Sequence, residues 1–235
     1  MTAPLTPVKA PARILTLDVL RGFALFGILL MNIQSFAMPE AAYFIPAVYG
    51  NLEGANRVIW WFGYLFADQK FMTLFSMLFG AGIILMTAKA ERTGGSALGL
   101  HYRRMFWLLV IGLIHGYLFW SGDILVLYAI CGFIVYWCRR WTPTWLLTAG
   151  LLIFAIGPLI GLSGAAAMSF TPDEMQVELV ADFWPPPAAI EAELAAYQGG
   201  WGKQMTQRVP STLEMQTAAL LYWGIWRAGG LMLIG

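Results

Sequence analysis

Long apolar segments separated by short polar ones are the feature that most restricts how this chain can fold. A helix needs about 20 apolar residues to cross a bilayer, and in lipid such helices satisfy their own backbone polar groups. The chain is 59% hydrophobic and 11% charged, whereas soluble domains carry about 25% charged residues. We therefore predict an all-α, polytopic membrane protein with about six spans. The predicted spans are Ile14–Phe36, Phe71–Ala88, Met105–Trp120, Ile124–Trp137, Trp145–Met168 and Leu213–Gly235.

The polar segments divide the chain into four parts. Residues 1–13 are rich in proline and alanine and are predicted to form a mobile tail. Residues 14–168 are predicted to form a bundle of five spans, and residues 169–212 a proline-rich, acidic extracytoplasmic loop. Residues 213–235 begin a sixth span that has no polar flank after it. The chain is therefore expected to be the N-terminal part of a longer protein, with further helices to follow.

Two segments allow a second interpretation. The first span could be a cleaved signal peptide, because Ser35-Phe36-Ala37 has the form of a cleavage site. The polar residues Asp18, Asn32 and Gln34 favour a retained helix instead. Val58–Phe66 is too short to cross the bilayer. It is expected either to lie in the interface, where Trp and Tyr are enriched, or to form a bent helix with the span that follows.

The basic residues indicate the orientation of the spans. Lysine and arginine accumulate in the cytoplasmic connections of membrane proteins, and here they occupy alternate connections. They are Lys9, Arg13 and Arg21, then Lys89, Arg92, Arg103 and Arg104 in a predicted polar loop at 89–104 that also holds His101, and then Arg139 and Arg140. The N-terminus is therefore predicted to be cytoplasmic. The segment 37–57, the Ser121-Gly122-Asp123 turn and the acidic loop are predicted to face outward.

Several polar residues fall inside or beside the apolar spans, where an ionisable group is expensive and marks a candidate functional site. His115 is ten residues into the predicted third span, about 15 Å at 1.5 Å per residue, which predicts a position near mid-depth or slightly outward of it. Gly112 and Gly116 flank it at a spacing that lets a neighbouring helix approach closely. We expect an outward-leaning polar pocket formed by Asn32, Asp68, Lys70, His115, Asp123 and Arg227.

Each of the main candidates also has a purely structural interpretation. His115 could bond a backbone carbonyl or a hydroxyl across a helix interface, and Asp123 could cap the helix that follows it. Lys70 could extend its long side chain to the headgroup region, and Asn32 could form an interhelical hydrogen bond. The residues alone leave both interpretations open.

Other notable residues are interpreted as structural. Cys131 and Cys138 are the only cysteines and lack a metal-ligand spacing, so they are predicted to pack as small apolar residues. Asp18 and Arg21 are three apart and are expected to form a local ion pair. Gly80 is interpreted as a packing position.

Five motifs follow one another along the chain in a recognisable order. They are LDVLRGFALFGILLMN at 17–32, KFMTLFSMLFGAG at 70–82, Tyr102-Arg103-Arg104, the block from His115 through Gly122-Asp123 to Tyr128-Ala129, and WRAGGLML at 226–233. Their order and spacing resemble the YeiB-like family of bacterial inner-membrane proteins, which implies a multi-pass protein of that membrane. The family is in turn similar to the transmembrane acyltransferases, including heparan-α-glucosaminide N-acetyltransferase, in the LDxxRG opening and the asparagine near the end of the first helix.

The similarity implies acyl transfer from a cytosolic acyl-CoA to a small-molecule or glycan acceptor on the outer side. The acetyltransferase pattern has a histidine after that asparagine, and this chain has none there, so His115 is the candidate to replace it. His115 would act as base, Asp123 would orient it, and Asn32 would donate to the developing oxyanion. The substrate-binding candidates are Asp68, Lys70, Arg227, and, for the CoA phosphates, Arg103 and Arg104.

Two other functions fit the same pattern of residues. Intramembrane ionisable residues also mark the paths of transporters and permeases, and the acidic loop could serve a non-enzymatic scaffold or sensor. No bound cofactor or metal is expected, with acyl-CoA as a co-substrate. The expected partners are the lipid bilayer and the acceptor rather than nucleic acid, and self-association is left open.

Overall fold

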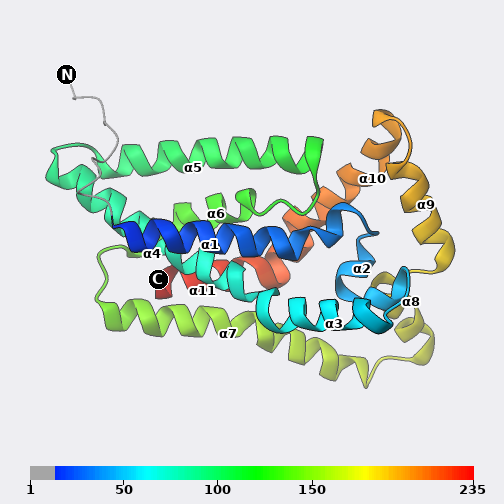
Figure 1. Ribbon diagram of the computed structural model, residues 1–235. Helices are drawn as coiled ribbons and strands as arrows, with labels where there is room; N and C mark the ends of the chain where they lie inside the picture. Colours follow the sequence, from blue (N-terminus) through cyan, green and yellow to red (C-terminus); the bar gives the residue numbers. More distant parts are fainter. Residues whose placement is uncertain (1–13) are drawn as a thin grey trace.

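The protein is built from helices, and no strand occurs among the residues that the structure describes. The computed structural model describes residues 14–235, apart from the side chains of residues 178 and 180–183. The tail predicted at 1–13 lies outside the described residues. The predicted all-α, polytopic class is confirmed. Figure 1 shows the long helices running side by side, with the shorter α2, α8 and α9 gathered at one end.

α-Helices and π-helical stretches make up most of the described residues, with short 3₁₀ turns at Gln34–Phe36, Pro46–Val48 and Tyr136–Cys138. The α-helices are α1 Leu15–Asn32, α2 Ala41–Phe44, α3 Gly54–Phe62, α4 Lys70–Arg92, α5 Ala97–Ile114, α6 Leu125–Val135, α7 Pro143–Met168, α8 Asp173–Phe183, α9 Pro187–Tyr197, α10 Trp201–Glu214 and α11 Ile225–Ile234. Three π-helical stretches, Gly63–Ala67, His115–Phe119 and Met215–Gly224, extend or join them. The last of these makes α10 and α11 one continuous helix, Trp201–Ile234.

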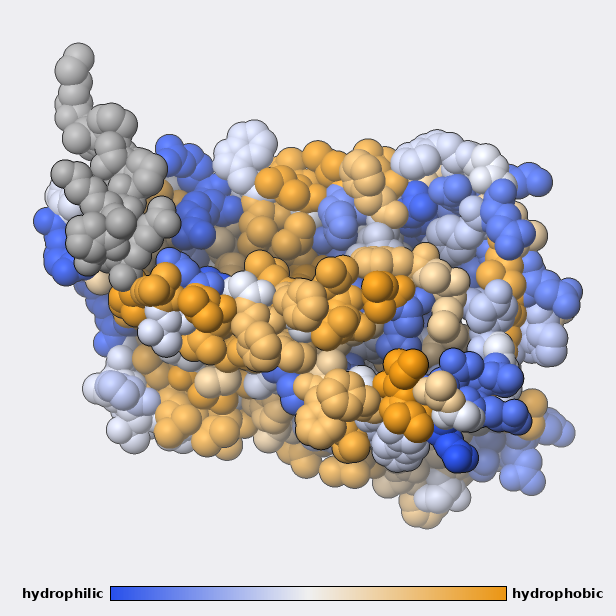
Figure 2. All heavy atoms as spheres, viewed as in Figure 1, coloured by the Kyte–Doolittle hydropathy of each residue, from blue (hydrophilic) through white to orange (hydrophobic). Residues whose placement is uncertain are grey.

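Five of these helices are long and apolar enough to cross a membrane. They are Leu15–Asn32, Gly54–Arg92, Ala97–Phe119, Pro143–Met168 and Trp201–Ile234, and Leu125–Cys138 is a shorter apolar helix. Many of their large apolar side chains are exposed. Figure 2 shows hydrophobic residues over the middle of the bundle and hydrophilic residues gathered toward its two ends. This distribution is typical of a multi-pass membrane protein, because lipid contacts the apolar belt.

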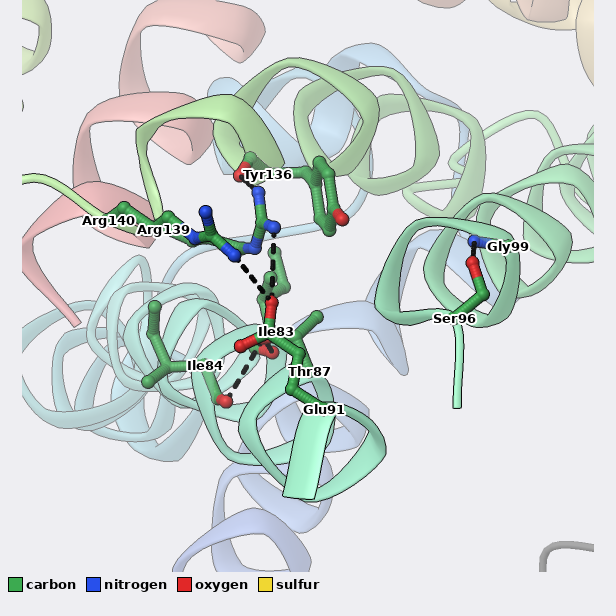
Figure 3. Close-up of polar contacts among 9 residues, drawn as sticks. All are labelled: Ile83, Ile84, Thr87, Glu91, Ser96, Gly99, Tyr136, Arg139 and Arg140. Carbon is green, nitrogen blue, oxygen red and sulfur yellow. Dashed lines mark hydrogen bonds and ion pairs between the residues drawn. The ribbon is translucent and has the colours of Figure 1, made fainter. Parts of the chain in front are cut away.

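The basic connections meet at one end of the bundle, which we call the basic end. Arg139 and Arg140, after α6, both donate to Glu91 at the end of α4, over 3.3 and 3.1 Å (Figure 3). Arg21 and Asp18 form the expected ion pair there, 3.2 Å long. The opposite end, which carries the turn at 120–124 and the helices α2, α9 and α10, is called the distal end below.

The polar loop predicted at 89–104 is wrong. α4 continues to Arg92 and α5 begins at Ala97, so only residues 93–96 connect them. Ser96 starts α5, because its Oγ accepts the backbone N–H of Gly99 over 3.0 Å (Figure 3). His101 is therefore not in a loop. It lies fully buried in α5, where its Nε2 donates to the carbonyl of Gly132 over 2.9 Å.

The segment 169–212 is not a loop either. It forms α8, α9 and α10, and the helix that includes the predicted sixth span begins at Trp201, not at Leu213. Proline misled the prediction: Pro187 occupies the first turn of α9, where its missing N–H is not needed. Val58–Phe66 forms α3 and part of a π-helical turn, joined to α4 at a bend where Gln69 has a φ of 63°. This matches the bent-helix alternative.

α6 lies at the centre of the bundle. Its side chains are buried on most sides by α4, α5 and α11. Tyr128 is almost completely buried and shares a 2.6 Å hydrogen bond with Ser76 of α4. Longer helices thus shelter a helix that is short for a membrane span, and its polar groups find partners inside the protein.

α11 passes between α4 and α7 at very close range. A methyl group added at Gly230 would lie 2.7 Å from the carbonyl oxygen of Gly150 in α7, and one added at Gly150 would lie 2.8 Å from the carbonyl oxygen of Gly230. Gly80 of α4 lies directly against the backbone of Met232. These glycines let helix backbones approach each other, as small residues do in membrane proteins, which confirms Gly80 as a packing position.

We predict that Gly230→Ala destabilises the bundle, whereas Gly229→Ala does not. Both substitutions add one methyl group to the same helix. The methyl at Gly229 meets only the Cys131 sulfur at 3.8 Å, an ordinary contact. At Gly230 the helices must separate, at a cost of about 1–3 kcal/mol. Thermal unfolding of the purified protein in detergent measures the difference, and equal melting temperatures for the two variants would contradict the predicted crossing.

Candidate functional site

His115 lies near the distal end of its helix. It begins a π-helical turn that extends α5 to Phe119. Because α5 begins at Ala97, His115 is 18 residues into the helix, or about 27 Å at 1.5 Å per residue. The helix thus begins eight residues before the predicted start at Met105, and His115 lies nearer to its distal end than that start implied. The helix is longer than predicted at its basic end, and the histidine lies correspondingly further along it.

His115 and Asp123 form a pair across the turn of the helical hairpin. His115 Nδ1 lies 2.8 Å from Asp123 Oδ1. The aspartate side chain is completely buried, whereas the imidazole is 39% exposed. A carboxylate can only accept hydrogen bonds, so Nδ1 carries a proton, and in the neutral imidazole Nε2 is then the nitrogen with the lone pair. The pair therefore has the geometry of a base oriented by a carboxylate.

Asp123 also supports the fold. Its second oxygen, Oδ2, accepts the backbone N–H of Val126 in the first turn of α6 over 3.0 Å. The predicted capping role is thus present together with the histidine contact. The two interpretations are not alternatives, because each uses a different oxygen of the same carboxylate.

The turn that carries His115 is held in place by α10. Thr212 donates its hydroxyl to the carbonyl of Gly116 over 2.8 Å, and Arg208 donates to the carbonyl of Leu118 over 2.9 Å. Such carbonyls are left without helical partners at the end of a helix. The close approach predicted from the glycine spacing is confirmed, since a methyl group at Gly116 would lie 3.0 Å from Thr212 Cγ2. The histidine that bonds a backbone carbonyl is His101, and not His115 as the structural interpretation had it.

A cavity of about 920 Å³ lies next to this pair. Asp123 lines it, as do Phe119 and Trp120, whose rings lie 6.4 and 6.1 Å from the His115 imidazole between centroids. The other side chains of the wall are mostly apolar. The charged residues that line the cavity are Glu40, Asp123, Glu193, Arg208 and Arg227.

The structure brings some of the predicted site residues together. Asn32 at the end of α1, Asp123 and Arg227 of α11 all line the cavity, and His115 adjoins it through Asp123. Arg227 donates to the carbonyl of Gln69 over 2.8 Å and to the Thr73 hydroxyl over 3.0 Å. The left-handed backbone at Gln69 is part of the bend before α4, where this carbonyl meets Arg227.

Other predicted site residues lie elsewhere. Asp68 is outside the cavity wall and accepts the hydroxyl of Tyr43, which does line the cavity, over 2.8 Å. Burial and the neighbouring carboxylate raise the pKa of Tyr43, so the phenol stays the donor. Lys70 is exposed and donates to the carbonyl of Tyr64 over 2.8 Å. Arg103 and Arg104 are exposed on the basic half of α5, far along the helix from the cavity.

Three charged residues of the cavity wall, Glu40, Glu193 and Arg208, were not predicted as site residues from the sequence. Glu193 of α9 accepts the backbone N–H of Glu40 over 2.9 Å, and partial burial raises the pKa of Glu193. Arg208 is only 7% exposed and lies beside the rings of Tyr197 and Trp201. The one available signal was that Arg208, with Lys203, is a basic residue in a segment that is acidic overall. No group of His, Cys, Asp or Glu suited to a metal ion occurs among the described residues.

Three uncharacterised bacterial proteins are similar to this chain. YeiB of Escherichia coli (strain K12) is 34% identical over 231 residues, which are 95% of this chain and 54% of that protein. This similarity supports the YeiB-like resemblance of the sequence motifs. YxaH of Bacillus subtilis (strain 168) is 36% identical over 159 residues, 65% of this chain and 39% of that protein. A 39.9 kDa protein from the amylase 3′ region of Bacillus acidopullulyticus is 39% identical over 129 residues, 55% of this chain and 35% of that protein.

The three similar proteins are uncharacterised, so their names assign no activity to this chain. No protein-family model matches the chain, and no solved structure matches it. The chain spans about half the length of the E. coli relative and less of the two Bacillus proteins. Function is therefore argued from the geometry of the site.

We predict that Asp123→Ala lowers the stability of the protein more than Asp123→Asn. Alanine removes the acceptor for the first turn of α6, which costs about 1–2 kcal/mol, whereas asparagine caps helices as well as aspartate does. Thermal unfolding in detergent, followed by circular dichroism, compares the variants. If both lose the same stability, the bond from Val126 contributes nothing measurable.

Proposed function

We propose that this protein is a membrane acyltransferase in which His115 acts as the general base. The observation that carries the proposal is the 2.8 Å contact between His115 Nδ1 and the buried carboxylate of Asp123. An imidazole held in this way has one fixed tautomer and a free Nε2 lone pair. This arrangement suits the removal of a proton from an attacking hydroxyl or amine.

The reaction can be written with these residues. The acceptor oxygen or nitrogen attacks the carbonyl carbon of a thioester, and its proton moves to His115 Nε2. As the new bond forms, the carbon–sulfur bond breaks, and the thiolate leaves and recovers the proton from the imidazolium. Asp123 stabilises that imidazolium through the contact with Nδ1. Asn32, on the wall of the same cavity, would donate its amide to the oxyanion.

The positions of the arginines fit a donor that approaches from the basic end. Arg103 and Arg104 precede His115 on the same helix, and the second of them is 11 residues away, or about 16 Å along the axis. Guanidinium groups bind the phosphates of CoA well. The thioester arm would then have to extend over that distance to the distal end, where the acceptor would occupy the cavity.

We predict that His115→Ala and Asp123→Asn each reduce acyl transfer by about 10²–10⁴-fold, the contribution typical of general acid–base catalysis. The assay uses proteoliposomes with radiolabelled acetyl-CoA and a total extract of bacterial lipids and glycans as acceptors. Asp173→Asn is the matched control, because it makes the same chemical change at an exposed carboxylate in the first turn of α8, outside the cavity wall. Unchanged transfer by His115→Ala would rule out His115 as the base.

The same vesicles separate acyl transfer from transport. A permease would move labelled solutes across the bilayer when no acyl-CoA is present, and that movement would not depend on a thioester. Flux without any acylated product, from protein that unfolds at the normal temperature, would replace the acyltransferase proposal with the transporter.

A further inference from the structure

Arg208 is a buried cation that forms no ion pair with the carboxylates the structure describes. Its guanidinium donates to the Leu118 carbonyl over 2.9 Å and to the Gln204 side-chain oxygen over 3.2 Å. A guanidinium has five N–H donors, and two of them have acceptors among the described residues, which leaves three without one there. The residue is 7% exposed and lines the 920 Å³ cavity. These three N–H groups are therefore available to a ligand in the cavity.

The acidic residues of the cavity do not neutralise Arg208. No carboxylate of the described residues lies within ion-pair distance of its guanidinium. Asp123 is engaged by His115 and Val126, Glu193 by the backbone of Glu40, and the Glu40 carboxylate by the side chain of Ser211. A buried charge without a counter-charge is strongly unfavourable. An anion bound in the cavity would remove that cost.

The second arginine of the cavity wall, Arg227, lies at a different position along the same helix axis. Arg227 lies 19 residues after Arg208 on one continuous helix, about 28 Å along the axis. A single small anion therefore cannot contact both. Arg227 also lies in the field of Asp68 and has neutral partners in Gln69 and Thr73. Arg208 is thus the cation that an anionic group would meet at the distal end.

The rest of the cavity wall is suited to hydrocarbon. Phe154, Gly157 and Pro158 of α7 line it together with Leu220 and Trp223 of the helix Trp201–Ile234. Both helices are candidate membrane spans, so we infer that this apolar part of the cavity meets the acyl chains of the bilayer. Arg208, by contrast, lies at the distal end, next to the exposed Trp201. The cavity thus has a cationic end and an apolar end.

We propose that the cavity binds an anionic lipid, with its phosphate headgroup against Arg208 and its hydrocarbon chain between α7 and the helix Trp201–Ile234. The inference does not depend on acyl transfer, because binding occurs without a donor. A ligand seated there would lie beside Asp123 and the His115 turn.

Native mass spectrometry of the detergent-purified protein tests this inference. Phosphatidylglycerol is titrated against the protein, with phosphatidylcholine as the lipid of no net charge and inorganic phosphate as the anion without a chain. We expect Arg208→Gln to weaken phosphatidylglycerol binding by about tenfold or more, the effect of losing one charge-assisted hydrogen bond. Arg57→Gln is the matched control, since Arg57 is an exposed arginine of α3 outside the cavity wall.

A second variant probes the apolar end and leaves the arginine in place. Ala219 lines the cavity, and Ala219→Phe fills that space, so it should also weaken phosphatidylglycerol binding about tenfold. Equal binding of the two lipids, equal affinities of Arg208→Gln and Arg57→Gln, or unchanged binding by Ala219→Phe would each overturn the proposal. Displacement of the lipid by inorganic phosphate would overturn it as well, and would indicate a site for free anions.

Discussion

The backbone contact between α11 and its neighbours is the constraint on which the rest of the structure depends. Helices in lipid gain nothing from hiding apolar surface, so they associate through close packing. Gly150 and Gly230 allow α7 and α11 to approach until their backbones touch, and Gly80 does the same for α4. α11 can therefore stand beside α6 and bring Arg227 to the bend at Gln69. Larger side chains at these crossings would move α11, and with it one wall of the cavity.

The site depends on a second constraint, which is the shortness of the hairpin between α5 and α6. Only the residues between Phe119 and Leu125 connect the two helices. Asp123 therefore has to face both the end of the first helix and the start of the second. One carboxylate oxygen bonds the backbone of α6 and the other bonds His115. The stability of the hairpin and the orientation of the imidazole thus rest on the same side chain.

The sequence predicted the membrane class well, because apolar length alone determines which segments can cross lipid. It also predicted the neighbourhood of His115 and Asp123, since the turn between them is too short to separate them. The ends of helices were predicted less well. His101, for example, lies buried in a helix, because the carbonyl of Gly132 accepts the hydrogen bond that its ring N–H would otherwise lose. That compensation comes from a distant part of the chain, and local composition does not reveal it.

The cavity wall was predictable only in part for the same reason. Asn32 and Arg227 stand out as polar residues in apolar runs, and both line the cavity. Glu193 and Arg208 belong to a segment that reads as a polar loop, so their position in the wall follows from tertiary packing. Lys70 was predicted as a site residue from the sequence, but it lies outside the cavity wall, where its ammonium group donates to the carbonyl of Tyr64.

The bonds from α10 to the histidine turn have a mechanical consequence. Arg208 and Thr212 hold two carbonyls of that turn, and the same arginine forms part of the cavity wall. α10 thus contacts both the cavity in which a ligand would bind and the backbone of the turn that carries His115. A shift of this helix would therefore move the cavity wall and the turn that carries His115 together.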